Sequence, residues 1–146
     1  MVTKLVIGYG NTLRCDDGFG PAVIAELTAL GNVAGVQYLE KQLLTVDLVE
    51  ELEQVSLCVF VDAATTGDIG ALVEKWVEPN DEEITVLGHD LTPSALLALA
   101  RKLSGKIPTC VLLSTRLLNA ELGEILSPEV AALVPKTAER VLELVR

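Results

Sequence analysis

Aromatic side chains and long apolar runs are both scarce in this sequence. Only 3% of the 146 residues are aromatic, whereas 50% are hydrophobic. A core of the size that one ordinary domain needs must therefore be built from aliphatic side chains. No apolar run reaches the roughly 18 residues that a membrane span needs, and the N-terminus does not resemble a signal peptide. We expect a single domain over residues 1–146, monomeric, cytoplasmic and without a membrane partner.

Basic residues, cysteine and histidine are also few. Eleven Lys and Arg stand against 21 Asp and Glu, which leaves a net charge of −10. A surface of this sign repels a phosphate backbone, so we expect no nucleic-acid partner. Three cysteines give no paired disulfide framework, and Cys58 and Cys110 lie in apolar runs where they are expected to fill the core. The single histidine, His89, excludes any zinc site that takes two histidines from one chain.

Short apolar runs alternate with helical patterns along the chain. This alternation is typical of a mostly parallel sheet with helices on both faces. In such sheets the functional residues lie beyond the carboxyl ends of the strands, where the strand order reverses. The predicted strands are 4–9, 36–39, 57–61, 71–78 at an edge, and 109–114; the predicted helices are 21–30, 46–54, 93–103, one beginning at 128 after an N-cap at Ser127 and interrupted near Pro135, and a last one ending at Val145.

The segment after the first strand combines Gly8 and Gly10 with two adjacent carboxylates, Asp16 and Asp17. It is not a dinucleotide fingerprint, because Leu13 stands where the third glycine belongs and the carboxylates would repel a pyrophosphate. A turn with one Asp as a helix cap is the plainest interpretation. A second carboxylate beside a strand end favours a hard or borderline metal.

Asp62 and His89 are two further candidate metal ligands. Asp62 ends the apolar run 57–61, where a carboxylate is costly unless a charge or hydrogen bonds compensate it. It is either a turn residue or a ligand, and the first and third strands are neighbours in common doubly wound orders. His89 is either a surface or capping residue or the imidazole that joins the carboxylates. Two oxygens and one imidazole suit a borderline divalent metal and leave positions open for a partner's ligands.

Nucleophilic catalysis is a weaker alternative. Cys15 with His89 as its base is conceivable, but the adjacent carboxylates oppose formation of a thiolate. A serine triad would also depend on His89, and the chain has no G-x-S-x-G elbow.

Four motifs, in order along the chain, carry a family resemblance. They are Gly8-x-Gly10-Asn11-x-Leu13-x-x-Asp16-Asp17-Gly18-x-Gly20, Val61-Asp62-Ala63, His89 before a helix, and Leu126-Ser127-Pro128-Glu129-Val130. With these motifs the chain resembles the hydrogenase maturation proteases, which process the large subunit of nickel–iron hydrogenases. The resemblance spans nearly the whole chain, and its first motif is highly specific.

The resemblance implies a fold and a function. The implied fold is a three-layer α/β/α arrangement of the phosphorylase/hydrolase-like kind, with a five-stranded, mostly parallel, twisted sheet of order 2-1-3-5-4 whose fourth strand is antiparallel. The implied activity removes the C-terminal extension of the [NiFe] hydrogenase large-subunit precursor. Asp17, Asp62 and His89 would ligate nickel that the substrate brings, and Asp17, Asp62 or Asp16 would act in catalysis. Gly10 and Asn11 would bind substrate.

One segment departs from the family pattern. Many members carry an Asp-Gly-Gly-Thr-like stretch after the second strand, where this chain has Glu40-Lys41-Gln42-Leu43-Leu44-Thr45. Roles assigned to that Asp or those glycines are therefore not expected here. The stretches 42–45, 89–93 and 121–124 look closer to the branch that serves bidirectional, NAD-linked hydrogenases.

Two other functions remain open. A magnesium-binding receiver-like signalling domain also has paired acids after its first strand and an Asp after its third. A receiver's acids follow the strand at once, and it needs a lysine after the last strand, where this chain has Ser114-Thr115-Arg116. A nickel or hydrogenase chaperone without protease activity would use the same ligands.

Overall fold

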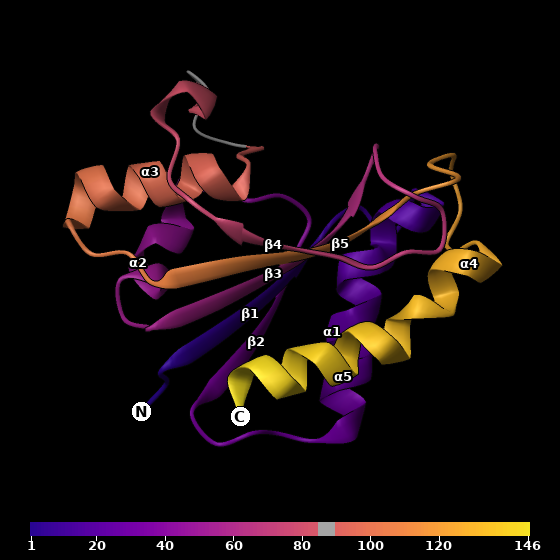
Figure 1. Ribbon diagram of the computed structural model, residues 1–146, viewed down its shortest axis with the longest axis horizontal. Helices are drawn as coiled ribbons and strands as arrows, with labels where there is room; N and C mark the ends of the chain where they lie inside the picture. The colour runs from indigo at the N-terminus through magenta and orange to yellow at the C-terminus, as the bar shows by residue number, and fades with distance from the viewer. Residues whose placement is uncertain (85–89) are drawn as a thin grey trace.

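The computed structural model describes residues 1–84 and 90–146, and these build a five-stranded sheet of order β2-β1-β3-β5-β4. β4 runs antiparallel to β5, and the other neighbouring strands are parallel (Figure 1). The strand order and the antiparallel edge strand implied by the family resemblance are thus confirmed. The strands are β1 (Lys4–Tyr9), β2 (Val36–Lys41), β3 (Leu57–Ala64), β4 (Val73–Val77) and β5 (Thr109–Arg116).

Helices cover both faces of the sheet, as Figure 1 shows. α1 (Phe19–Leu30) and α5 (Leu133–Val145) pack on one face, and α2 (Val49–Leu52) and α3 (Pro93–Ser104) on the other. Short elements complete the chain: η1 (Cys15–Gly18), η2 (Val46–Leu48), η3 (Asp81–Glu83) and α4 (Pro128–Ala131). The three-layer α/β/α architecture is confirmed. No helix in the described ranges is both long and apolar enough to cross a membrane.

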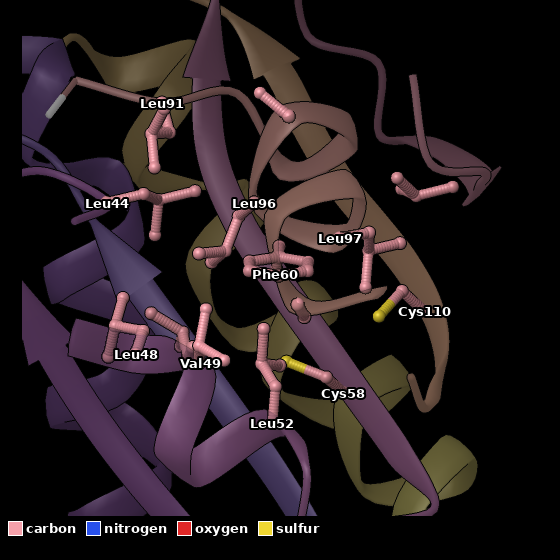
Figure 2. Close-up of a cluster of buried hydrophobic side chains, with 14 of the residues drawn as sticks. Leu44, Leu48, Val49, Leu52, Cys58, Phe60, Leu91, Leu96, Leu97 and Cys110 are labelled. Atoms are coloured by element: carbon pink, nitrogen blue, oxygen red, sulfur yellow. The ribbon is translucent and has the colours of Figure 1, made fainter. Parts of the chain in front are cut away.

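Two aliphatic cores hold the layers together. The core between the sheet and α2 and α3 contains Leu48, Leu52, Phe60 and Leu96, all almost completely buried (Figure 2). Cys58 and Cys110 lie opposite each other on β3 and β5 in the same core, as free thiols. The prediction that these cysteines fill the core is confirmed, and the aliphatic composition expected of the core is confirmed with it.

Two predicted helices differ in detail. The segment 46–54 forms only η2 followed by one turn of α2. The interruption predicted near Pro135 falls at Ala132, between α4 and α5, so that Pro135 lies in the first turn of α5. Proline has no amide hydrogen and its ring clashes with the carbonyl four residues earlier, so a helix tolerates it only near its start.

Glycines bring α1 into direct contact with the strand ends. A Cβ atom on Gly20 would collide with the carbonyl oxygen of Val61 and lie 2.6 Å from the backbone nitrogen of Tyr9. A Cβ atom on Gly8 would collide with the carbonyl oxygen of Gly20. The first turn of α1, and η1 before it, are therefore held against the carboxyl ends of β1 and β3.

Candidate functional site at the carboxyl edge of the sheet

Asp17 and Asp62 meet at the carboxyl edge of the sheet. Asp17 lies in η1 after β1, and Asp62 lies near the end of the neighbouring strand β3. Burial raises the pKa of Asp62 to about 7, and the negative charges of Asp17 and Asp90 add to the rise. The negative charges of the two carboxylates therefore repel each other. A cation bound between them would relieve this repulsion.

Tyr9 restrains Asp62 from the end of β1. Its hydroxyl hydrogen-bonds to the Asp62 carboxylate, and the Asp62 carboxylate also accepts the backbone N–H of Ala63 at 2.8 Å. The Tyr9 ring packs edge-on against Phe60, with centroids 6.5 Å apart and planes at 88°. Burial and the nearby carboxylates raise the pKa of Tyr9, so its hydroxyl keeps its proton and serves as a donor. In the sequence only its place between two glycines of the first motif could have pointed to Tyr9.

Gly10 and Asn11 position Asp17. The backbone N–H of Asn11 donates to the Asp17 carboxylate at 2.7 Å. Gly10 has a φ of 143°, and a Cβ atom there would collide with the carbonyl oxygen of Asp17. The loop can fold back on itself only because this residue is glycine. The structure thus gives both motif residues a structural task; a role for them in binding substrate stays a prediction.

Asp16 points into the protein and organises the loop after β5. Its buried carboxylate accepts the backbone N–H groups of Leu118 (2.8 Å), Asn119 (3.0 Å) and Ser127 (2.7 Å) and the Ser127 hydroxyl (2.8 Å). Burial alone would raise the pKa of Asp16, but these hydrogen bonds outweigh it and hold the pKa below its ordinary value. This carboxylate is fully buried and committed to the loop, so it is not placed to activate a water.

The two expected helix caps have different outcomes. Ser127 is the N-cap of α4, as predicted, but its hydroxyl donates to the Asp16 carboxylate and forms no side-chain capping bond. The acidic pair does not cap α1, whose N-cap is Gly18, so that expectation was wrong.

His89, the predicted third nickel ligand, lies outside the described residues. Its neighbour Asp90 is described, with a left-handed φ of 54°, and its negative charge acts on Asp62 and Tyr9. Over residues 1–84 and 90–146, no three His, Cys, Asp or Glu residues are grouped closely enough to hold a metal ion. Within these ranges Asp17 and Asp62 are thus two carboxylates with no third metal-binding group beside them, and their role as metal ligands stays a prediction.

The segment that departs from the family pattern connects two loops at this edge. The carbonyl oxygen of Lys41 accepts the N–H of Gly10 at 3.0 Å, and that of Leu44 accepts the N–H of Leu91 at 3.1 Å. The Leu44 side chain is buried in the core beside α3 (Figure 2). Residues 41–44 therefore support the loops that carry Asp17 and Asp90, and the sequence pattern did not predict this.

Solved structures share this architecture over almost the whole chain. The hydrogenase 2 maturation peptidase from Thaumarchaeota archaeon SCGC_AB-539-E09 has 26% sequence identity and a TM-score of 0.73, with 97% of each chain covered. The hydrogenase maturating endopeptidase HybD from E. coli has 20% identity and a TM-score of 0.78, covering 99% of this chain and 93% of its own. The [NiFe] hydrogenase maturation protease HycI from Thermococcus kodakarensis has 24% identity and a TM-score of 0.74, covering 97% and 91%.

The fold of this chain is that of the hydrogenase maturation peptidases, from the first strand to the last helix. The resemblance carried by the sequence motifs is confirmed by these structures, whereas the bidirectional branch stays a prediction. No protein-family model and no curated protein sequence matches the chain.

Proposed function

We propose that this chain is an endopeptidase that removes the C-terminal extension of a nickel-loaded [NiFe] hydrogenase large-subunit precursor, and that nickel carried by the substrate is its recognition element. The observation that carries the proposal is the meeting of Asp17 and Asp62 at the carboxyl edge of a sheet that maturation peptidases share. The partner is the precursor, and the protein acts in the cytoplasm.

The chemistry of the donors suits a metal that arrives with its other ligands. Carboxylate oxygens are weak ligands for nickel compared with thiolates. Asp17 and Asp62, with His89 as the proposed third donor, would hold such an ion only while substrate groups complete its coordination. An unloaded precursor would then not be recognised.

The side chains around Asp62 would prepare it for this role. The Tyr9 hydroxyl donates a hydrogen bond to the Asp62 carboxylate and orients it. Asp17 would be the second metal ligand. A cation between the two stabilises their charged forms and thereby lowers the pKa of Asp62. Because Asp16 is committed to the loop after β5, Asp17 and Asp62 are the carboxylates that we assign to nickel recognition and to water activation.

The rival receiver-like function has less support. A receiver would use a lysine after the last strand, and this chain has Arg116 at the end of β5. The Arg116 guanidinium is exposed and donates to the carbonyl oxygen of Gly67 at 3.2 Å. It therefore anchors the loop after β3 and does not reach toward Asp62 as a phosphate partner would.

The test is an assay of precursor size. The purified chain is mixed with nickel-loaded or nickel-free precursor, and the product is measured by mass spectrometry. We expect loss of the C-terminal extension only from the loaded precursor, and no loss with Asp62→Asn or Asp17→Asn. Asp68→Asn is the matched control, since Asp68 is an exposed carboxylate in the loop after β3.

Each alternative has its own outcome in this assay. If the chain binds loaded precursor without cleaving it, its function is that of a chaperone and not of a protease. If a small phosphodonor phosphorylates Asp62, the function is that of a receiver-like signalling domain. If the Asp62→Asn variant cleaves the precursor normally, Asp62 is not part of the active site.

A further inference from the structure

Three adjoining cavities form a trough beside the candidate site. The first, of about 220 Å³, is lined by Gly10, Asn11 and Leu13, among others. It shares Thr12, Pro21 and Glu40 with a second of about 310 Å³. The second shares Cys15, Glu124 and Leu126 with a third of about 390 Å³, so the three follow one another along the surface.

One end of the trough is lined by the loop that positions Asp17. Asn11 lines the first cavity, and its backbone N–H is bonded to the Asp17 carboxylate at 2.7 Å. The other end lies under the segment that follows β5, which Figure 1 shows in orange beside the start of α1. A chain lying in the trough would therefore run from that segment toward Asp17.

The far end of the trough is apolar and uncovered. Leu122 and Ile125 line it with 88% and 82% of their surfaces exposed, and the half-buried Leu126 lies next to them. Leu13, in the wall of the first cavity, is 55% exposed. Large apolar side chains gathered in this way beside a site mark a surface that binds another molecule.

The charges along the trough are acidic and available. Glu40 lines two of the cavities and Glu124 two, and both side chains are exposed. Neither forms an ion pair with any residue of the described ranges. Lys41 is the one basic residue among those that line the trough within the described ranges. With a net charge of −10 for the whole chain, the surface favours a basic occupant.

The trough has firm walls. Gly123 accepts the N–H of Cys15 at 2.8 Å and donates its own N–H to the carbonyl oxygen of Leu13 at 2.9 Å, so the two loops pair like strands. The four hydrogen bonds of the buried Asp16 carboxylate hold the segment 118–127 that carries Gly123. A groove that is already shaped loses little conformational entropy when it binds.

We propose that this trough seats an extended segment of the polypeptide substrate next to the bond that is cut. An apolar side chain of the segment packs on Leu122 and Ile125, and a Lys or Arg side chain faces Glu40 and Glu124. The inference rests on the proposed function and adds to it a chemical preference for the substrate sequence.

The test separates binding from chemistry by measuring KM and kcat for the nickel-loaded precursor. Ile125→Lys places a charge in the apolar end, and we expect KM to rise roughly tenfold with kcat unchanged. Leu103→Lys is the matched control, because Leu103 is 64% exposed at the end of α3 on the other face of the sheet. It should leave both constants unchanged.

The acidic side chains have a parallel test. The double variant Glu40→Gln with Glu124→Gln should raise KM about threefold at low salt and less at high salt, as exposed ion pairs are weak and screened. The exposed Glu53→Gln is its control. Equal melting temperatures show that each variant is folded.

The outcomes distinguish the two proposals. If the wild-type chain cleaves the precursor and Ile125→Lys has an unchanged KM, the trough is not the substrate groove, and the proposed function stands. If the wild-type chain does not cleave the loaded precursor at all, both proposals fail. An equal rise of KM in Leu103→Lys would also overturn the proposal that the trough binds substrate, because the effect would then come from an added surface charge at any position.

Discussion

The carboxylate of Asp16 accepts two hydrogen bonds from Ser127, one from its backbone N–H at 2.7 Å and one from its hydroxyl at 2.8 Å. This pair joins the loop after β1 to the residue that precedes α4, 111 positions later in the chain. The buried Asp16 carboxylate thus joins the two loops that form the trough, in addition to the backbone hydrogen bonds of Gly123. Asp17, the next residue, accepts the N–H of Asn11 instead and lies at the sheet edge.

Asp16→Ala should destabilise the protein without touching the carboxylate pair. Three backbone N–H groups and one hydroxyl would lose their acceptor, and we expect the free energy of unfolding to fall by about 2–4 kcal/mol. The measurement is thermal unfolding followed by circular dichroism. Asp68→Ala, at an exposed position, is the control. A melting temperature equal to that of the wild type would show that the Asp16 hydrogen bonds are not needed to hold this loop.

Asp16 and Asp62 should impose opposite pH dependences on stability. The pKa of Asp16 is lowered in the folded state, so its contribution is present above pH 4 and is lost as the pH falls through the folded pKa. The pKa of Asp62 is raised to about 7, so the folded state binds its proton more tightly than the unfolded state does. Ionisation of Asp62 therefore costs stability progressively as the pH rises from about 4 to about 7.

Asp62→Asn makes this cost measurable. The variant should be more stable than the wild type by about 1–3 kcal/mol at pH 8, and the difference should vanish near pH 4. Denaturant titrations at both pH values measure it. A variant that is less stable at pH 8 would show that Asp62 is a structural turn residue whose charge the fold requires.

Tyr9→Phe and Asp17→Asn should shift the pKa of Asp62 in opposite directions. The Tyr9 hydroxyl stabilises the charged carboxylate, so its removal should raise this pKa above about 7. Removal of the Asp17 charge should lower it, because that charge opposes ionisation. Carbon NMR of the Asp62 carboxyl group during a pH titration reports both shifts. Movement of the pKa in the same direction in the two variants would show that Tyr9 and Asp17 do not act on Asp62 in opposite senses.

Gly20→Ala should loosen α1 from the sheet. The added Cβ atom would collide with the carbonyl oxygen of Val61, and backbone atoms have no room to yield. We expect a loss of about 2–3 kcal/mol, as for other overpacked contacts. Gly18→Ala is the comparison, because its Cβ atom would meet Thr12 at 3.3 Å and needs only a small adjustment. Equal stability of the two variants would contradict the close approach of α1.

A chelator should leave the fold intact. Both cores are formed mainly by aliphatic side chains on either face of the sheet, and Asp17 and Asp62 lie at its edge. Far-ultraviolet circular dichroism and the melting temperature should therefore be the same before and after treatment with chelator. A large loss of secondary structure would reveal a structural metal.

The sequence by itself determined the alternation of strands and helices, because apolar periodicity and helix-start residues such as Pro93 act locally. The helix α3 begins at Pro93, as predicted. The structure adds a capping bond, in which the Thr92 hydroxyl accepts the N–H of Ala95 at 3.1 Å. Asp62 and the pair Asp16 and Asp17 became candidate ligands because they follow two apolar strands, whereas the strand order and the choice of Asp17 came from motif resemblance. The edge position of β4 followed from its own loose alternation.

Only the tertiary structure supplies the physical reason why Asp17, and not the adjacent Asp16, faces the sheet edge. Asp16 and Asp17 have identical side chains, and nothing local distinguishes them. Their roles differ because Ser127, more than a hundred residues away, supplies donors to one, while Asn11 supplies a donor to the other. The partnership of Tyr9 with Asp62 and the trough between two loops were decided in the same way, since each depends on segments that meet only when the sheet has formed.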